Sequence, residues 1–221
     1  MKKVLFLFVL LTVTLFLNSP SQGNSISYYF DLNNIGLTGG PWGIVTINEV
    51  DNYRVDFTVD PYVNAFVPLT NFGLQAFGFN EATSDSSKLN ITSLPIGWGW
   101  TYSEDNEGGF GPYGKFDIKT DGTGGSRQDP LTFSVTVPDF SFTISLATFN
   151  VELSTTNYLF AGHIADFNSG LYDNAGNLIT SGMFSTTGTP VGNPVPEPAT
   201  MLLLGSGLLG LAGFARRRFK K

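Results

Sequence analysis

The stretch YRVDFTVD at residues 53–60 alternates apolar and polar side chains at every position. Successive side chains of a β-strand point to opposite faces, so this pattern is typical of a strand with one buried face. Asp51-Asn52 separates it from the apolar segment 42–50, and we predict a tight hairpin turn there with positive φ. The expected buried face carries Tyr53, Val55, Phe57 and Val59, and the opposite face carries Arg54, Asp56, Thr58 and Asp60.

The same alternation recurs between residues 26 and 164, with Gly, Asn, Asp and Pro clustered between the apolar segments as in turns. No window between the signal peptide and Ala199 has a convincing helical period. Many short strands with Gly-rich turns predict an all-β domain, an antiparallel, jelly-roll-like β-sandwich. The expected strands are residues 26–32, 42–50, 53–59, 73–80, 113–118, 131–137, 140–146 and 158–164.

The first 23 residues have the pattern of a secretory signal peptide. A basic start, Met1–Lys3, is followed by the apolar stretch Val4–Leu17 and then by polar, turn-prone residues. Such a segment is read by the Sec translocon and removed by signal peptidase. We expect cleavage after Gly23, with an uncleaved N-terminal anchor as the alternative.

Charge and cysteine content restrict the function of the part between the two ends. Of the 12 basic residues only five lie between residues 24 and 194, against 17 of the 18 acidic residues, which gives a net charge near −12. Phosphate binding needs clustered Lys and Arg, so no nucleic-acid partner is expected. The chain has no Cys, so its stability must come from an apolar core.

The C-terminal segment combines three kinds of sequence in a fixed order. Val195-Pro196-Glu197-Pro198 is held extended by its prolines, and Ala199–Ala215 follows without a charge. This apolar stretch has 17 residues, the short end of a single transmembrane helix. The basic stop Arg216-Arg217-Arg218 and the last residues, through Lys221, are expected to stay cytoplasmic.

This order of elements resembles the PEP-CTERM sorting signal of Gram-negative bacteria. The resemblance covers residues 195–218, and the chain departs from it only in three residues beyond the Arg cluster. It implies an exosortase as processing partner, transient anchoring in the inner membrane, and a role beside exopolysaccharide export. An ordinary single-pass anchor that stays uncut is the alternative.

Together these features divide the chain into four parts. They are a signal peptide (1–23), a β-sandwich ectodomain (24–187), a flexible stalk (188–194) and the sorting signal (195–221).

Three aromatic side chains, Trp98, Trp100 and Tyr102, alternate along one face of residues 96–102. If that face is open, it forms a platform on which sugar rings could stack. If it faces inward, it belongs to the core, where aromatic residues dominate burial. A period of two fits both an open platform and a buried face, and we prefer the assignment of this face to the core.

No catalytic constellation is evident, so we expect no enzyme activity and no catalytic residues. His163 is the only histidine and there is no Cys, which excludes a Cys–His pair and a three-histidine zinc site within one chain. Acidic groups at residues 104–107, Asp117, Asp121 and 173–177 offer oxygen ligands for Ca²⁺, but turn chemistry explains them without a metal. We expect no cofactor and leave the metal question open.

The sequence therefore predicts a secreted or surface protein, exported across the inner membrane and processed by an exosortase. Its expected role is a non-enzymatic component of the extracellular polysaccharide or biofilm matrix. One alternative is a carbohydrate-binding module that uses the aromatic platform, and a less favoured one is a secreted hydrolase with paired carboxylates.

Overall fold

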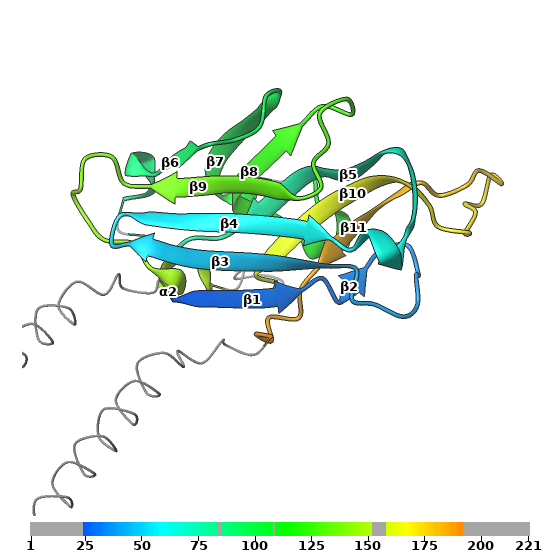
Figure 1. Ribbon diagram of the computed structural model, residues 1–221, viewed down its shortest axis with the longest axis horizontal. Helices are drawn as coiled ribbons and strands as arrows, with labels where there is room; N and C mark the ends of the chain where they lie inside the picture. The colour runs from blue at the N-terminus through cyan, green and yellow to red at the C-terminus, as the bar shows by residue number, and fades with distance from the viewer. Residues whose placement is uncertain (1–23, 84, 108, 152–157, 192–221) are drawn as a thin grey trace, which may run out of the picture. The chain divides into compact units, whose positions relative to one another are not determined.

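The computed structural model is all-β, with two antiparallel sheets (Figure 1). This confirms the predicted class and is consistent with a β-sandwich, while the finer jelly-roll description stays a prediction. Asn24–Pro194 is one compact unit. The expected signal peptide and sorting signal lie outside the described residues. The structure describes residues 24–83, 85–107, 109–151 and 158–191.

The first sheet has five strands, and all its pairs are antiparallel. The predicted hairpin at its centre is confirmed, since Asp51 pairs with Arg54 across the turn. The turn itself differs from the expectation, because neither Asp51 nor Asn52 has a positive φ. In the described part of the chain, the residues other than glycine with positive φ are Ser93, Phe140 and Asp166. The strand order is β1 (Ser25–Tyr29), β3 (Gly43–Asp51), β4 (Arg54–Pro61), β9 (Leu131–Thr136) and β6 (Asn90–Thr92).

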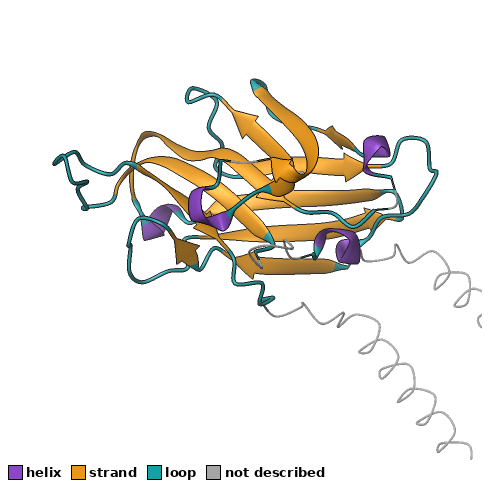
Figure 2. Ribbon diagram, turned by 180° about the vertical axis from the view of Figure 1, so that it is seen from behind, coloured by secondary structure: helices purple, strands orange, loops and turns teal. Residues whose placement is uncertain are grey.

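The second sheet has six strands and packs against the first, as the orange strands in Figure 2 show. Four short helices lie in the connections: η1 (Val63–Ala65), η2 (Ser86–Lys88), η3 (Gly111–Tyr113) and α2 (Leu146–Phe149). The strand order is β2 (Leu32–Asn33), β11 (Ser181–Ser185), β10 (Phe160–Asn168), β5 (Val67–Phe79), β8 (Phe116–Gly122) and β7 (Trp98–Glu107).

Aromatic side chains fill the space between the sheets. The ring of Phe57 on β4 lies 4.9 Å from that of Phe133 on β9 and 4.9 Å from that of Phe79 on β5. Phe149 of α2 contacts the same ring at 5.4 Å. The alternation predicted for residues 53–60 is confirmed, because Val55, Phe57 and Val59 are all buried.

A second, smaller cluster covers the other face of the six-stranded sheet. Phe110, Tyr113, Phe116 and Ala161 form it, and the loop that carries η3 supplies the first two. A Cβ on Gly78 of β5 would lie 2.5 Å from Phe110 Cε2 and 3.0 Å from Phe116 Cδ2. Phe110 therefore packs directly onto the backbone of β5, at a position that only glycine leaves open.

The predicted strand at residues 140–146 is wrong. Residues 138–145 form a turn and a loop, followed by α2. Phe140 is 66% exposed with φ of 54°, whereas Ile144 is buried and its amide donates to Asn52 O at 2.8 Å. Because β4 and β6 already occupy both edges of β9, the segment after β9 has no adjacent edge to pair with.

The segment expected as one strand at residues 26–32 is interrupted instead. β1 belongs to the first sheet and β2 to the second, so the chain changes sheets between Tyr29 and Leu32. The strands β6 and β11 were not predicted, and β7 continues through residues 104–107, which were expected to form a loop.

Part of the predicted stalk, residues 188–194, is hydrogen-bonded to the fold. Pro190 forms an antiparallel bridge with Tyr28, and the Val191 amide donates to Ser27 O at 2.7 Å. Just before it, the amide and hydroxyl of Thr187 donate to Asp31 at 2.8 and 2.5 Å. The last described residues therefore lie along the edge of β1.

Gly78→Ala tests the contact between Phe110 and β5. The added methyl group must displace the buried Phe110 ring, so we expect a loss of about 1–3 kcal/mol in the free energy of unfolding. Denaturant unfolding of the Asn24–Pro194 unit measures it. Gly99→Ala is the matched control, because nothing lies within 4 Å of its Cβ position, and it should leave the stability within about 0.5 kcal/mol. Equal stabilities of the two variants would contradict the contact.

Candidate functional site

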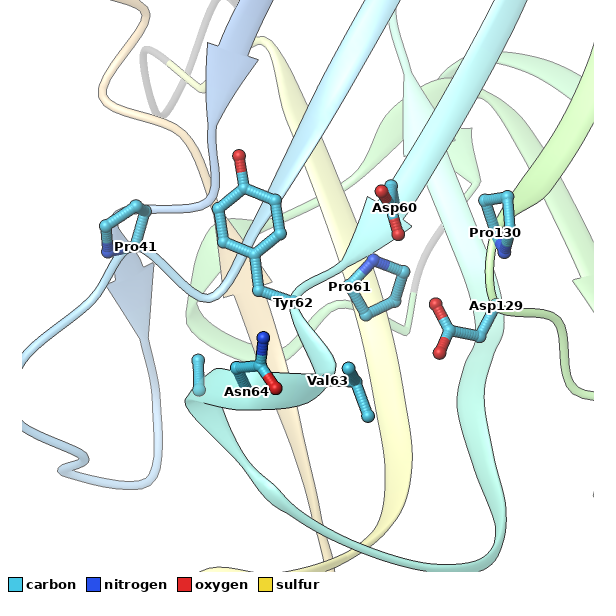
Figure 3. A pocket seen from close by; sticks show the side chains of 9 residues that line it. Pro41, Asp60, Pro61, Tyr62, Val63, Asn64, Asp129 and Pro130 are labelled. Carbon is cyan, nitrogen blue, oxygen red and sulfur yellow. The ribbon is translucent and has the colours of Figure 1, made fainter.

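An open pocket of about 610 Å³ lies where β4 ends and η1 begins (Figure 3). Two carboxylates, one tyrosine and three proline rings face it, and η1 closes one side. Its size falls within the range of roughly 300–1,000 Å³ that is usual for small-molecule sites. The lining residues are Pro41, Asp60, Pro61, Tyr62, Val63, Asn64, Ala65, Asp129 and Pro130.

Two Asp-Pro dipeptides create the pocket. The ladder between β4 and β9 has its last pair at Val59 and Leu131. Proline has no N–H to continue a ladder, and Pro61 and Pro130 stand just beyond that pair. The preceding residues, Asp60 and Asp129, are thereby left side by side at the open end of the two strands (Figure 3).

The two carboxyl groups interact. The pKa of Asp129 is raised above its ordinary value of 3.8, first by partial burial, then by the negative charge of Asp60 and a hydrogen bond with it. Burial disfavours the charged form of a carboxyl group, and a second carboxylate nearby adds to that effect. Asp129 therefore holds a proton more readily than an isolated aspartate does.

Tyr62 forms the wall next to η1. Its amide donates to Trp42 O at 2.9 Å, and its carbonyl accepts from Ala65 N at 2.8 Å. The ring of Tyr29 meets the Tyr62 ring edge-on, at 6.3 Å and 67°. Burial raises the pKa of the Tyr62 phenol, with smaller effects from Tyr29 and Asp60. The phenol thus stays neutral at physiological pH and is free to donate a hydrogen bond.

The pocket thus combines hydrogen-bond acceptors with apolar ring surfaces. The carboxylates accept from hydroxyl or ammonium donors, while the tyrosine and proline rings offer contact to C–H groups.

The structure brings the predicted platform residues together on β7 but turns them toward the core. Trp98, Trp100 and Tyr102 are partly buried and pack against the main apolar cluster. Trp98 Nε1 also donates to Ser126 O at 2.5 Å. Stacking a sugar needs an open ring face, and these contacts take up part of each ring's surface. Their role in glycan binding stays a prediction.

His163 lies on β10, half-buried, opposite Ala76 of β5 and Met183 of β11. Burial lowers its pKa, and the positive charges of Arg127 and Lys119 lower it further. The imidazole is therefore neutral at pH 7. Its partners in the two ladders, Ala76 and Met183, carry apolar side chains.

Of the acidic groups considered for Ca²⁺, the side chains at residues 104–107 lie outside what the structure describes, and the others have partners of their own. Asp173 Oδ1 accepts from the amides of Ala175 and Asn177 at 2.8 and 2.9 Å, so it stabilises its own turn. Asp121 pairs with Lys119 at 3.4 Å, and Asp117 Oδ2 accepts from the amide of Glu81. Within the described residues, no group of three or more His, Cys, Asp or Glu side chains is placed to hold a metal. Metal binding stays untested.

The residues of the pocket were not predicted from the sequence. Asp60 was assigned only to the polar face of its strand, and Asp129 and Tyr62 were not singled out. One signal was available, because Asp-Pro occurs twice in the chain and proline marks strand ends. The pairing of β4 with β9, however, depends on the tertiary structure and could not be predicted from either dipeptide alone.

The sorting residues Val195–Pro198 and the basic stop Arg216–Arg218 lie outside the described residues. In the part of the chain that is described, no helix has the length and apolar character needed to cross a membrane. No curated protein and no solved structure was found to match the chain. The family described as PEP-CTERM protein-sorting motif matches residues 194–218, the segment where the sequence resemblance placed it. The chain thus carries a PEP-CTERM protein-sorting motif.

Proposed function

We propose that this chain is exported, held in the inner membrane by its C-terminal segment, cleaved by an exosortase and left at the cell surface or in the extracellular matrix. The single observation that carries the proposal is the sorting motif at residues 194–218. The apolar run Ala199–Ala215 and the basic residues after it supply the stop and the orientation that such processing needs.

The arrangement of the ectodomain supports processing at both ends. Strand β1 begins at Ser25, directly after the expected signal-peptidase site, and the Asn24 carbonyl accepts from Glu49 N at 2.8 Å. The segment through Val191 is bonded to the same strand. Removing residues 1–23 and the sorting signal therefore takes nothing from either sheet.

For the mature protein we propose a non-enzymatic role in a polysaccharide or biofilm matrix. An acidic, cysteine-free β domain is soluble outside the cell, and its charge favours hydrated, cation-containing surroundings. The carbohydrate-binding and hydrolase alternatives differ from this role in a measurable way. The first requires glycan affinity in the purified ectodomain, and the second requires turnover that a single Asp or Glu substitution abolishes.

Intact-mass measurement of the protein from an exosortase-bearing Gram-negative host tests the sorting proposal. We expect loss of residues 1–23 and of the tail beyond about Pro196. Glu197→Ala should accumulate a heavier form that retains the tail and fractionates with membranes, because the extended motif is no longer recognised.

Pro190→Ala is the control for this measurement, since it replaces a nearby residue outside the matched region and should be processed as the unsubstituted chain is. A host that lacks the exosortase should yield the heavier form of every variant. Finding Arg216–Lys221 still attached in the exosortase-bearing host would overturn the proposal in favour of an ordinary anchor.

A further inference from the structure

We propose that the pocket between Asp60, Tyr62 and Asp129 is a saccharide site for a neutral or amino sugar. The proposal goes beyond sorting and does not depend on it, because the site lies wholly within the ectodomain. It also differs from the platform on β7 in its residues and in its place in the fold.

The walls of the pocket match the two kinds of surface on a sugar. A pyranose ring has apolar C–H surfaces and hydroxyl groups around its rim, so its sites pair ring surfaces with hydrogen-bonding groups. Here the rings of Tyr62, Pro41 and Pro61 line the same pocket as the two carboxylates (Figure 3). Tyr62 is held by its bond to Trp42 O and by the edge of Tyr29, so this wall is already formed.

The polar groups of the pocket need hydrogen-bond donors. Asp60 and Asp129 line the same pocket, and both are acceptors when ionised (Figure 3). Neighbouring hydroxyls on a sugar present two donors close together and would satisfy both carboxylates. Asn64, on η1 at the pocket edge, supplies a further amide donor and acceptor.

The negative charge of the pocket selects among sugars. Two carboxylates at the site, on a domain with a net charge near −12, repel an anionic ligand. Uronate or sulfated sugars are therefore disfavoured, whereas neutral sugars are accepted and an ammonium group on an amino sugar is attracted. The site thus discriminates by charge as well as by shape.

Titration calorimetry with the Asn24–Pro194 unit, which has its own core, tests the proposal. The probes are cellotetraose as the neutral sugar, the chitosan tetramer as the amino sugar, and tetragalacturonate as the anionic one. We expect at least one of the first two to bind about tenfold more tightly than tetragalacturonate. Equal or tighter binding of tetragalacturonate, or no binding of the other two at millimolar concentration, would overturn the proposal.

Substitutions locate the binding. Asp129→Asn removes a charge-assisted acceptor and should weaken binding about tenfold, and Tyr62→Ala should weaken it at least as much. Tyr172→Ala and Asp121→Asn are the controls, because neither residue lines the pocket. Tyr172 is 67% exposed, and Asp121 pairs with Lys119 on β8. Unchanged affinity in Asp129→Asn, or equal loss in the controls, would place the binding elsewhere and overturn the assignment.

The Asp129→Asn variant also separates binding from folding. Because the folded-state pKa of Asp129 is raised above 3.8, the stability it contributes is full below that pH and is lost as pH rises through the folded value. At pH 7 the Asp129→Asn variant should therefore unfold at the same temperature or about 1–3 °C higher, since solvent screens this partly buried pair. Weaker sugar binding by an equally stable variant cannot come from misfolding.

Calcium is the competing ligand for two carboxylates. Titration with CaCl₂ alone, in the same buffer, distinguishes a calcium site from a saccharide site. Calcium binding that Asp129→Asn abolishes, without any sugar binding, would overturn the saccharide assignment in favour of a cation site. Sugar binding that persists in EDTA supports it.

Discussion

The contact between Phe57 and its aromatic neighbours holds the two sheets together. Phe57 and Phe133 stack within the first sheet at 6° between ring planes, and Phe77 and Phe79 reach them from the second. The chain has no Cys and therefore no disulfide that could substitute for this packing. Each strand that contributes a ring must keep its alternation in register. The core therefore fixes the pairing of β4 with β9, and with it the place where β4 ends and β9 begins.

The alternation of apolar and polar side chains predicted a strand correctly where a neighbouring strand had a free edge for it to pair with. β4 and β9 follow the pattern read from residues 53–60 and 131–137. The segment 140–146 has the same alternation, yet it forms a loop because β9 already has a partner on each side. Side-chain period indicates which face is apolar, but the hydrogen-bond partner of a strand depends on the whole sheet.

The candidate site depended even more on tertiary structure. Each Asp-Pro pair alone indicates only where a strand ends. The two become a site because β4 and β9 are neighbours, and because the chain turns from Pro61 through Tyr62 into η1 at that point. Partial burial and the charge of Asp60 raise the pKa of Asp129, so the ionised form of Asp129 weakens the fold at neutral pH.

The edge of β1 connects the fold to the sorting motif. Val191 is hydrogen-bonded to Ser27, and only residues 192–194 separate it from Val195. A residue spans at most about 3.6 Å, so the chain between Val191 and Val195 reaches no farther than about 14 Å. Under the proposed processing, cleavage near Pro196 therefore takes place within this chain length of Val191, unless the bonds of Pro190 and Val191 to β1 are first broken.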